Sequence, residues 1–185
     1  MSTRDPDPPT RTTRRSQDTA RAEAQADRHA VRTTRLAMAC AGLMIAHQVA
    51  GKAARDAGFL SAFDVTLLPW MVMGAAVLSL AGVVLFSRLL SRLGPARVVP
   101  AAFLVSAVAQ GGEFLLLERS PQVGVVVFYL HMAVANVLLI SAFWSLLNET
   151  FDPRRGKRSF GRVAAAGALG GMIGGLLTAG AANTV

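Results

Sequence analysis

Charged residues are scarce over most of this sequence, and their distribution is uneven. Only 16% of the 185 residues are charged, whereas 52% are apolar. A soluble domain is usually about one quarter charged. The charges that are present concentrate in residues 1–35 and in two short basic clusters. This shortage of charge excludes an ordinary water-soluble domain and indicates lipid as the solvent of the remaining chain.

Cysteine is also nearly absent, since Cys40 is the single one and lies within an apolar run. One thiol excludes an intrachain disulfide and a cysteine-based metal site. No Ser-His-Asp, Cys-His or paired-carboxylate arrangement occurs at an enzymatic spacing, so we expect no enzyme, no metal and no cofactor. The formal net charge is +8, but the basic residues flank apolar spans without interleaved aromatics, which argues against nucleic acid as a partner.

Residues 1–35 lack large apolar side chains almost completely. They are rich in Arg, Asp, Pro and Thr and cannot bury a core. The composition predicts a disordered basic arm on the cytoplasmic side, followed by a transmembrane domain over residues 36–185.

Five long apolar runs make up the rest of the chain. The predicted spans cover about residues 36–51, 65–86, 98–117, 123–147 and 163–185. None shows the alternation of a membrane β-strand, so each is expected to be a helix. The first span is short for a bilayer core of about 30 Å, and tilt or local thinning would compensate. The predicted fold is therefore an all-α, polytopic helical bundle in the lipid bilayer.

Lysine and arginine alternate in number between the two sides of these spans. Sixteen of them lie in the arm and in the loops after the second and fourth spans, against three on the opposite side: Lys52, Arg55 and Arg119. Positive residues favour the cytoplasmic side. The pattern predicts a cytoplasmic N-terminus, in a bacterial inner (plasma) membrane.

A small charged cluster, Lys52, Arg55 and Asp56, ends the first span. These residues either reach the interface with long side chains or form part of a path for an anionic substrate. Both interpretations remain open at this point.

Four polar residues interrupt the third and fourth spans: Gln110, Glu113, His131 and Asn136. Glu113 either reaches the outer interface or faces the bundle interior, as a proton site or as a partner of Lys52 or Arg55. His131 and Asn136 point about 140° apart around a helix, so they cannot form one site alone. Helix–helix hydrogen bonds are the simpler explanation for both, and a substrate path is the alternative.

The fifth span is crowded with glycine. Its small residues repeat at intervals of four: Gly167, Gly170, Gly171, Gly174 and Gly175. Such spacing lets helix backbones approach closely in lipid. The glycine face is expected to pack within the chain, with self-association as the alternative.

Several short motifs lie at the ends of the predicted spans. Phe143-Trp144 and Asn148 close the fourth span, and the run from Lys157-Arg158 to Phe160-Gly161 opens the glycine-rich span. Earlier in the chain are Arg55-Asp56, Leu68-Pro69 and an Arg/Gly-containing loop over residues 87–97. Together, over about residues 36–185, these motifs resemble the ATP/ADP antiporter (nucleotide translocase) family and its bacterial major-facilitator relatives.

This resemblance implies the N-terminal part of a secondary transporter of about twelve spans. In full-length form it would exchange nucleotides or other anionic metabolites, using Lys52, Arg55 and Asp56 at the end of span one. His131 and Met132 stand where the exchangers carry an acidic residue before the Trp, a departure from strict ATP/ADP exchange. Alternating access would need a second transporter half.

A chain of five spans is then expected to be a fragment, a truncated gene product or a degenerate paralogue. The rival interpretation is a non-transporting membrane scaffold or regulatory subunit. It would use the glycine-rich fifth helix as its docking face for a partner.

Overall fold

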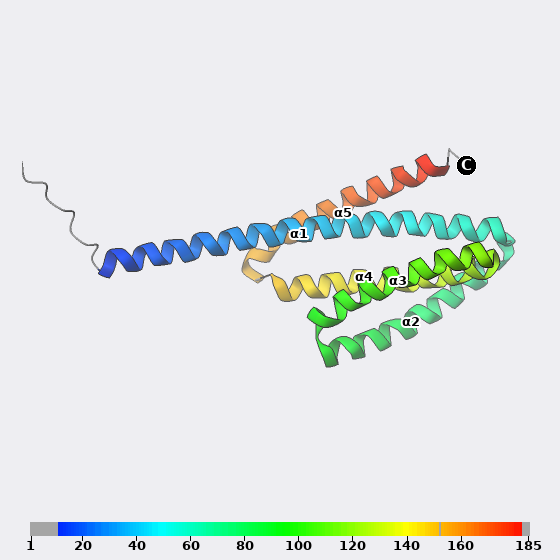
Figure 1. The fold of residues 1–185 in the computed structure, drawn as a ribbon, viewed down its shortest axis with the longest axis horizontal. Helices are drawn as coiled ribbons and strands as arrows, with labels where there is room; N and C mark the ends of the chain where they lie inside the picture. The colour runs from blue at the N-terminus through cyan, green and yellow to red at the C-terminus, as the bar shows by residue number, and fades with distance from the viewer. Residues whose placement is uncertain (1–10, 152, 183–185) are drawn as a thin grey trace, which may run out of the picture.

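The computed structural model describes residues 11–151 and 153–182, and all regular structure in them is helical (Figure 1). The elements in order are α1 Arg11–Ala62, the short 3-10 helix η1 Val65–Leu67, α2 Leu68–Leu93, α3 Pro95–Arg119, α4 Pro121–Thr150 and α5 Pro153–Ala182. Five of these helices are long and apolar enough to cross a membrane. The predicted all-α class is confirmed, as are five apolar helices of sufficient length for membrane spans, and these helices indicate a membrane protein.

The helices extend beyond the predicted spans at most of their ends. The first apolar segment continues past Gly51 to Ala62 without a break, so it is not short for a bilayer. The fifth helix is described to Ala182, and the last predicted residues, 183–185, lie outside the described residues.

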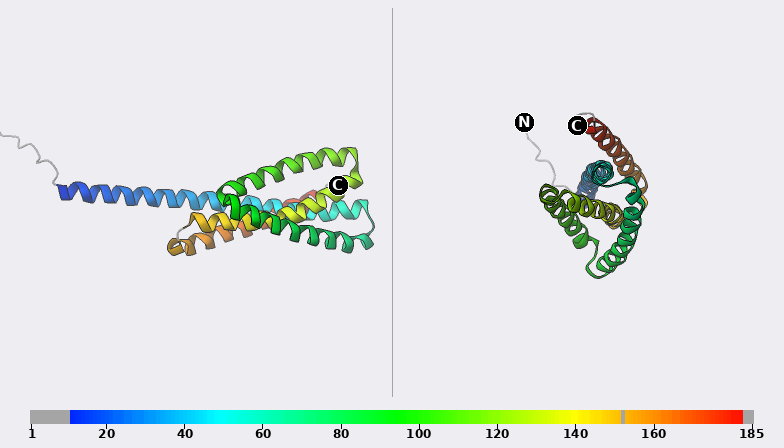
Figure 2. Two further views of the ribbon diagram at one scale, coloured as in Figure 1. Left: turned by 90° about the horizontal axis from the view of Figure 1, so that it is seen from below. Right: turned by 90° about the vertical axis from the view of Figure 1, so that its right-hand side faces the viewer.

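The predicted disorder of the arm is wrong for residues 11–35, which belong to α1 (Figure 1). The physical reason is composition, since Ala, Arg, Glu and Gln are strong helix formers and no Pro or Gly occurs between Arg11 and Ala41. The 52 residues of α1 span about 78 Å at about 1.5 Å per residue. Its first part projects beyond the other helices, and residues 24–32 are exposed (Figure 2). Residues 1–10 lie outside the described part.

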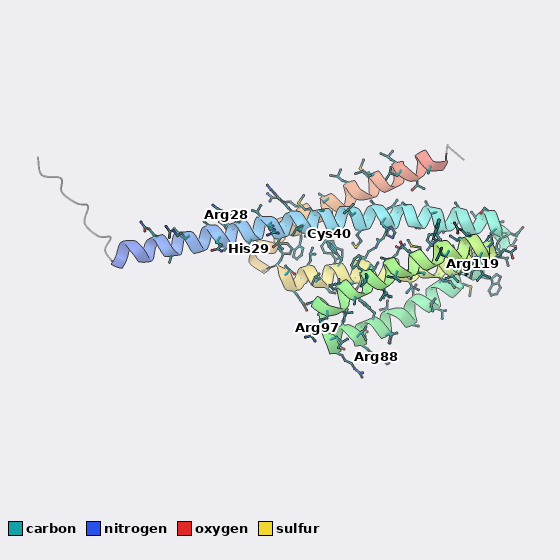
Figure 3. The ribbon with its side chains drawn as sticks, in the orientation of Figure 1. Arg28, His29, Cys40, Arg88, Arg97 and Arg119 are labelled. Carbon is teal, nitrogen blue, oxygen red and sulfur yellow. The ribbon has the colours of Figure 1, made fainter. Side chains whose placement is uncertain are left out.

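The helices run back and forth, so their connections gather at two ends of the bundle (Figures 1 and 2). The α2–α3 and α4–α5 connections lie at one end, which we call the basic end because Arg88, Arg92 and Arg97 lie there. The α1–α2 and α3–α4 connections lie at the other, the far end. Figure 3 shows Arg88 and Arg97 at the basic end and Arg119 at the far end.

Very short turns join consecutive helices, and most of the helices that follow have a proline in their first turn. Gly94 alone links α2 to α3, with a positive φ of 77° that L side chains rarely adopt. Pro95 and Pro121 occupy the first turns of α3 and α4, where no backbone N–H donor is required. Close antiparallel neighbours follow from these turns.

The glycine face of α5 packs against α1, in agreement with the default expectation from the sequence. A Cβ atom added at Gly170 would overlap the backbone of Gly42, and one at Gly174 would overlap the backbone of Ala46. The neighbouring Gly167, Gly171 and Gly175 face Ile45 and Val49 on the same helix. Only glycine permits this approach of two backbones.

Two apolar clusters hold the remaining helices together. Near the basic end, α1, α4 and α5 enclose Ala37, Ala41, Met44, Phe143, Leu147 and Val163. Near the far end, Phe59 of α1 packs with Ala75, Val125 and Tyr129. Polar residues that join α1, α3 and α4 lie between these two clusters along the bundle.

The aromatic residues at the end of α4 and the start of α5 pack against one another. The rings of Phe143 and Trp144 lie 5.8 Å apart, and Trp144 lies 6.1 Å from Phe160 on α5. Phe151 completes the group at 5.8 Å from Phe160. These contacts fasten the start of α5 to the end of α4.

Replacing Gly170 with Val is expected to destabilise the protein, because the added side chain would force α5 away from α1. Overpacking of this kind typically costs about 1–3 kcal/mol. Thermal unfolding in detergent, followed by circular dichroism, should show a lower midpoint. Gly161→Val is the matched control on the same helix, since nothing lies within 4 Å of a Cβ added there. Equal midpoints for the two variants would contradict the packing role.

Asp64 caps the turn between α1 and α2, and the pKa of its carboxyl group lies below the ordinary 3.8. The Thr66 hydroxyl donates to it at 2.7 Å and the Thr66 N–H at 2.9 Å. Because these bonds favour the ionised form, they are present above the ordinary pKa and are lost as pH falls through the lowered one. Thr66→Val removes the hydroxyl donor and should raise the Asp64 midpoint in a ¹³C carboxyl titration. An unchanged midpoint would show that the hydroxyl contributes nothing.

Candidate functional site

Three polar side chains line one face of α3 within the bundle. Ser106, Gln110 and Glu113 follow each other at intervals of four and three residues, which places them on one side of a helix. Ser106 and Glu113 are buried, with exposed fractions of 8% and 5%. A face of this kind is unusual in a helix whose other residues are mostly apolar, and it faces the interior.

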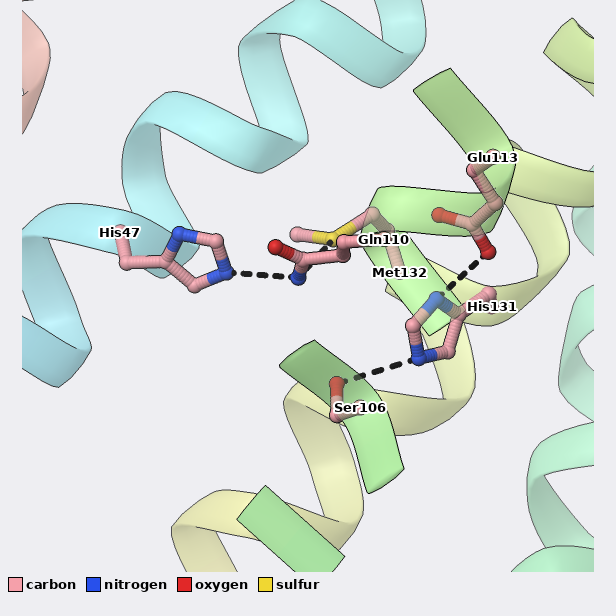
Figure 4. Close-up of polar contacts among 6 residues, drawn as sticks. All are labelled: His47, Ser106, Gln110, Glu113, His131 and Met132. Carbon is pink, nitrogen blue, oxygen red and sulfur yellow. Dashed lines mark hydrogen bonds and ion pairs between the residues drawn. The ribbon is translucent and has the colours of Figure 1, made fainter. Parts of the chain in front are cut away.

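Glu113 lies against His131 of α4 (Figure 4). The distance between its Oε1 and the Nδ1 of His131 is 2.6 Å, and the Glu113 side chain is only 6% exposed. The second carboxylate oxygen, Oε2, is buried and has no hydrogen-bond partner among the described residues. The Nδ1 of His131 likewise lacks a well-aligned hydrogen bond there. The two side chains are therefore in close contact, although their hydrogen-bonding groups are not all satisfied among the described residues.

The other ring nitrogen of His131 returns to α3. Its Nε2 lies 3.1 Å from the Ser106 hydroxyl (Figure 4). The imidazole is therefore held between a hydroxyl and a carboxylate of the same neighbouring helix. Which ring nitrogen carries a proton depends on the tautomer, and both do so in the imidazolium form.

Gln110 extends the polar contacts to α1. Its Nε2 lies 2.9 Å from the Nε2 of His47 and 3.6 Å from the sulfur of Met132 (Figure 4). The neighbouring Gln48 donates to the backbone carbonyl of Asn136 on α4 at 3.4 Å. We call these residues together with the pair the polar cluster: His47, Gln48, Ser106, Gln110, Glu113 and His131.

Along the bundle the polar cluster lies between the two ends, and within it Gln48, Ser106 and Glu113 are buried whereas His47 is exposed. Ser106 is near the middle of α3, and Gln48 is near the middle of the apolar part of α1. Glu113 and His131 lie one to two helical turns nearer the far end. Buried polar groups at this depth are expensive in lipid and mark functional paths by default.

A second charged group lies closer to the far end. Arg55 lies with its guanidinium carbon 4.3 Å above the Tyr129 ring, and its Nε donates to Asp56 at 2.9 Å. Its side chain is 12% exposed, against 40% for Asp56. Lys52 is exposed. The cation is thus held by a ring of α4 and a carboxylate of α1.

The structure brings together some of the predicted site residues and separates others. Glu113 faces the interior, but its partner is His131 rather than Lys52 or Arg55. Arg55 and Asp56 pair with each other. Asn136 joins the contacts only through its backbone carbonyl.

Ser106, His47, Gln48 and Tyr129 are absent from the predicted site. For Ser106, the spacing to Gln110 and Glu113 on one helical face was an available signal. For His47 and Gln48, two adjacent polar residues in an apolar run gave a similar one. No sequence pattern identifies the pairing of helices that brings these residues into contact.

The cluster can bind protons and can offer hydrogen bonds to a polar solute. Histidine and carboxylate exchange protons readily, and Gln and Ser supply both donors and acceptors. No group of three or more His, Cys, Asp or Glu side chains that could hold a metal ion occurs among the residues described. The donor set therefore suits a proton or an organic solute.

Comparison with protein-family models, curated proteins and solved structures finds no match to this chain.

A double-mutant cycle should detect the contact between Glu113 and His131. Glu113→Gln and His131→Asn are expected to be non-additive, with a coupling of about 0.5–3 kcal/mol in unfolding free energy. Unfolding in mixed micelles of increasing denaturing detergent provides the measurement. Glu118→Gln, in the last turn of the same helix and exposed, is the control partner for His131→Asn. Additivity in the first cycle would mean that the pair is not coupled.

Proposed function

We propose that this membrane protein is part of a secondary transporter that moves an anionic metabolite, a nucleotide in the first instance. The proposed class is a nucleotide-translocase-like branch of the major facilitator superfamily. It rests on the motifs around Phe143-Trp144 and Phe160-Gly161 and on the polar cluster.

The observation that carries the proposal is the polar cluster between α1, α3 and α4, in which Gln48, Ser106 and Glu113 are buried. A buried carboxylate paired with a histidine in an apolar bundle would reduce stability without a function to maintain it. Substrate sites of secondary transporters lie near the bilayer midplane between helices. The cluster has both the depth and the chemistry that such a site requires.

An anionic substrate is favoured by the cations that lie next to the cluster. Arg55 is held over Tyr129, and Lys52 lies one turn earlier on the same helix. A guanidinium binds phosphate or carboxylate through two parallel hydrogen bonds. Arg55, His47 and His131 would together offer positive or neutral donors to an anion.

The proposed location is a bacterial inner membrane with the basic end in the cytoplasm. Arg88, Arg92 and Arg97 lie at that end together with the first part of α1. Positive residues are retained on the cytoplasmic side during insertion. The far end, with Arg55 and Arg119, would then face outward.

A scaffold that docks partners through its glycine face has less support. α1 already covers that face, with Gly170 against Gly42 and Gly174 against Ala46. Transport, in turn, requires a second bundle for this one to move against. The second bundle would be another transporter half or another copy of the chain.

The test is nucleotide binding and uptake by the purified chain in liposomes. Saturable binding of labelled ATP is expected, weakened about tenfold or more by Arg55→Gln, because hydrogen bonds to charged groups contribute about 1.5–3 kcal/mol. Arg92→Gln is the matched control, since Arg92 is exposed at the basic end. Neither binding nor uptake above empty liposomes would remove nucleotides from the proposal. Equal losses in both variants would show a non-specific charge effect.

A further inference from the structure

We infer that Glu113 and His131 form the proton-binding site of this protein, and that protonation of the pair promotes binding of the anion. The first part stands on the geometry of the pair. The second part rests on the proposed function, because it needs an anionic solute in the same region.

The geometry of the pair is that of a site with room for one more proton. Glu113 is 5% exposed, yet its Oε2 has no hydrogen-bond partner among the described residues. Its Oε1 meets Nδ1 of His131 at 2.6 Å. An unpartnered carboxylate oxygen at this depth is costly, and a bound proton reduces that cost because a neutral acid is cheaper to bury than a carboxylate.

Other groups around the pair do not neutralise it through direct contact. From α1, the titratable groups nearest along the bundle are His47, which contacts Gln110, the exposed Lys52, and Arg55, which contacts Asp56 and the Tyr129 ring of α4. From α2, no titratable residue occurs between Leu68 and Ser87. α5 packs on α1 rather than on this pair. The pair therefore shares its protons chiefly within itself.

Protonation changes the charge of the site by one unit, whichever atom receives the proton. An ionised Glu113 beside a neutral His131 carries one negative charge. The same pair with one proton is neutral overall, and with two it carries one positive charge. No other bond forms or breaks, and the proton comes from water on the side to which the site is open.

This change of charge couples the proton to an anion. An anion near Glu113 is repelled by the unprotonated pair and is no longer repelled by the protonated one. Linkage is reciprocal, so the anion must in turn raise the affinity of the pair for a proton. Such coupling of binding is one requirement of a proton–anion symport.

The proton site can be tested without any anion. The His131 ring nitrogens and the Glu113 carboxyl carbon are followed by NMR in lipid nanodiscs between about pH 4 and 9, a range that includes the ordinary values of both groups. Coupled groups titrate at shared apparent midpoints. We expect such shared steps in the wild type, and we expect Glu113→Gln to abolish them.

Glu118→Gln is the control for this measurement, because it makes the same chemical change at an exposed position of α3. It should leave the His131 midpoint unchanged. Glu113→Asp retains a titratable carboxyl group and should retain the shared steps, even if Glu113→Gln fails to fold. The inference is overturned if His131 titrates alike in the wild type and in a folded Glu113→Gln variant, or if the wild-type pair takes up no proton in this range.

The coupling is tested with ATP as the probe, by its dissociation constant at about pH 6 and pH 8. Couplings between sites are typically about 5- to 150-fold, and we expect tighter binding at the lower pH by a factor in that range. Glu113→Gln should reduce the factor to what the protonation of ATP itself causes, and Glu118→Gln should behave as the wild type.

The two proposals fail in different ways. A pair that titrates as expected in a protein that binds no ATP removes the nucleotide proposal and leaves the proton site. ATP binding with the same pH dependence in wild type and Glu113→Gln overturns the coupling and leaves the proposed function.

Discussion

The close approach of α1 and α5 is the contact on which the other contacts of the bundle depend. Because Gly170 and Gly174 have no side chain, the backbone of α5 can contact the backbone of α1 at Gly42 and Ala46. Lipid offers no hydrophobic force between helices, so close backbone packing has to supply the attraction. Since the residues of α1 that contact α5 alternate with His47 and Gln48, the glycine face also sets which side of α1 turns toward α3 and α4.

The polar cluster therefore stands on an apolar framework. Phe59 and Tyr129 pack at the far end, and Phe143 packs at the basic end. Between these clusters, His131 is held by Ser106 and Glu113 from a single helix. Two neighbouring turns of α3 thus position both ring nitrogens, while α4 needs only to present the imidazole. Only α3 and α4 must be correctly placed for the pair to form.

The sequence predicts where the five apolar helices lie, but it does not predict which of their residues contact each other. Hydropathy and short turns predict five antiparallel helices, because each property is local to a few residues. The glycine spacing likewise predicts a packing face on α5. The pairing of Glu113 with His131 instead of Arg55 depends on the rotation of α3 against α4, which no local pattern records. Residues 11–35 are helical although they lack apolar residues, because their strong helix propensity does not require a core.

The length of α1 has a mechanical meaning. The helix is unbroken from Arg11 to Ala62, with no proline and no interruption between its projecting part and His47. An α-helix without a hinge behaves as a stiff rod, and kinks arise at identifiable defects such as proline. A rotation of the projecting part about the helix axis is accordingly transmitted to His47 and Gln48. The projecting part is therefore mechanically coupled to the polar cluster.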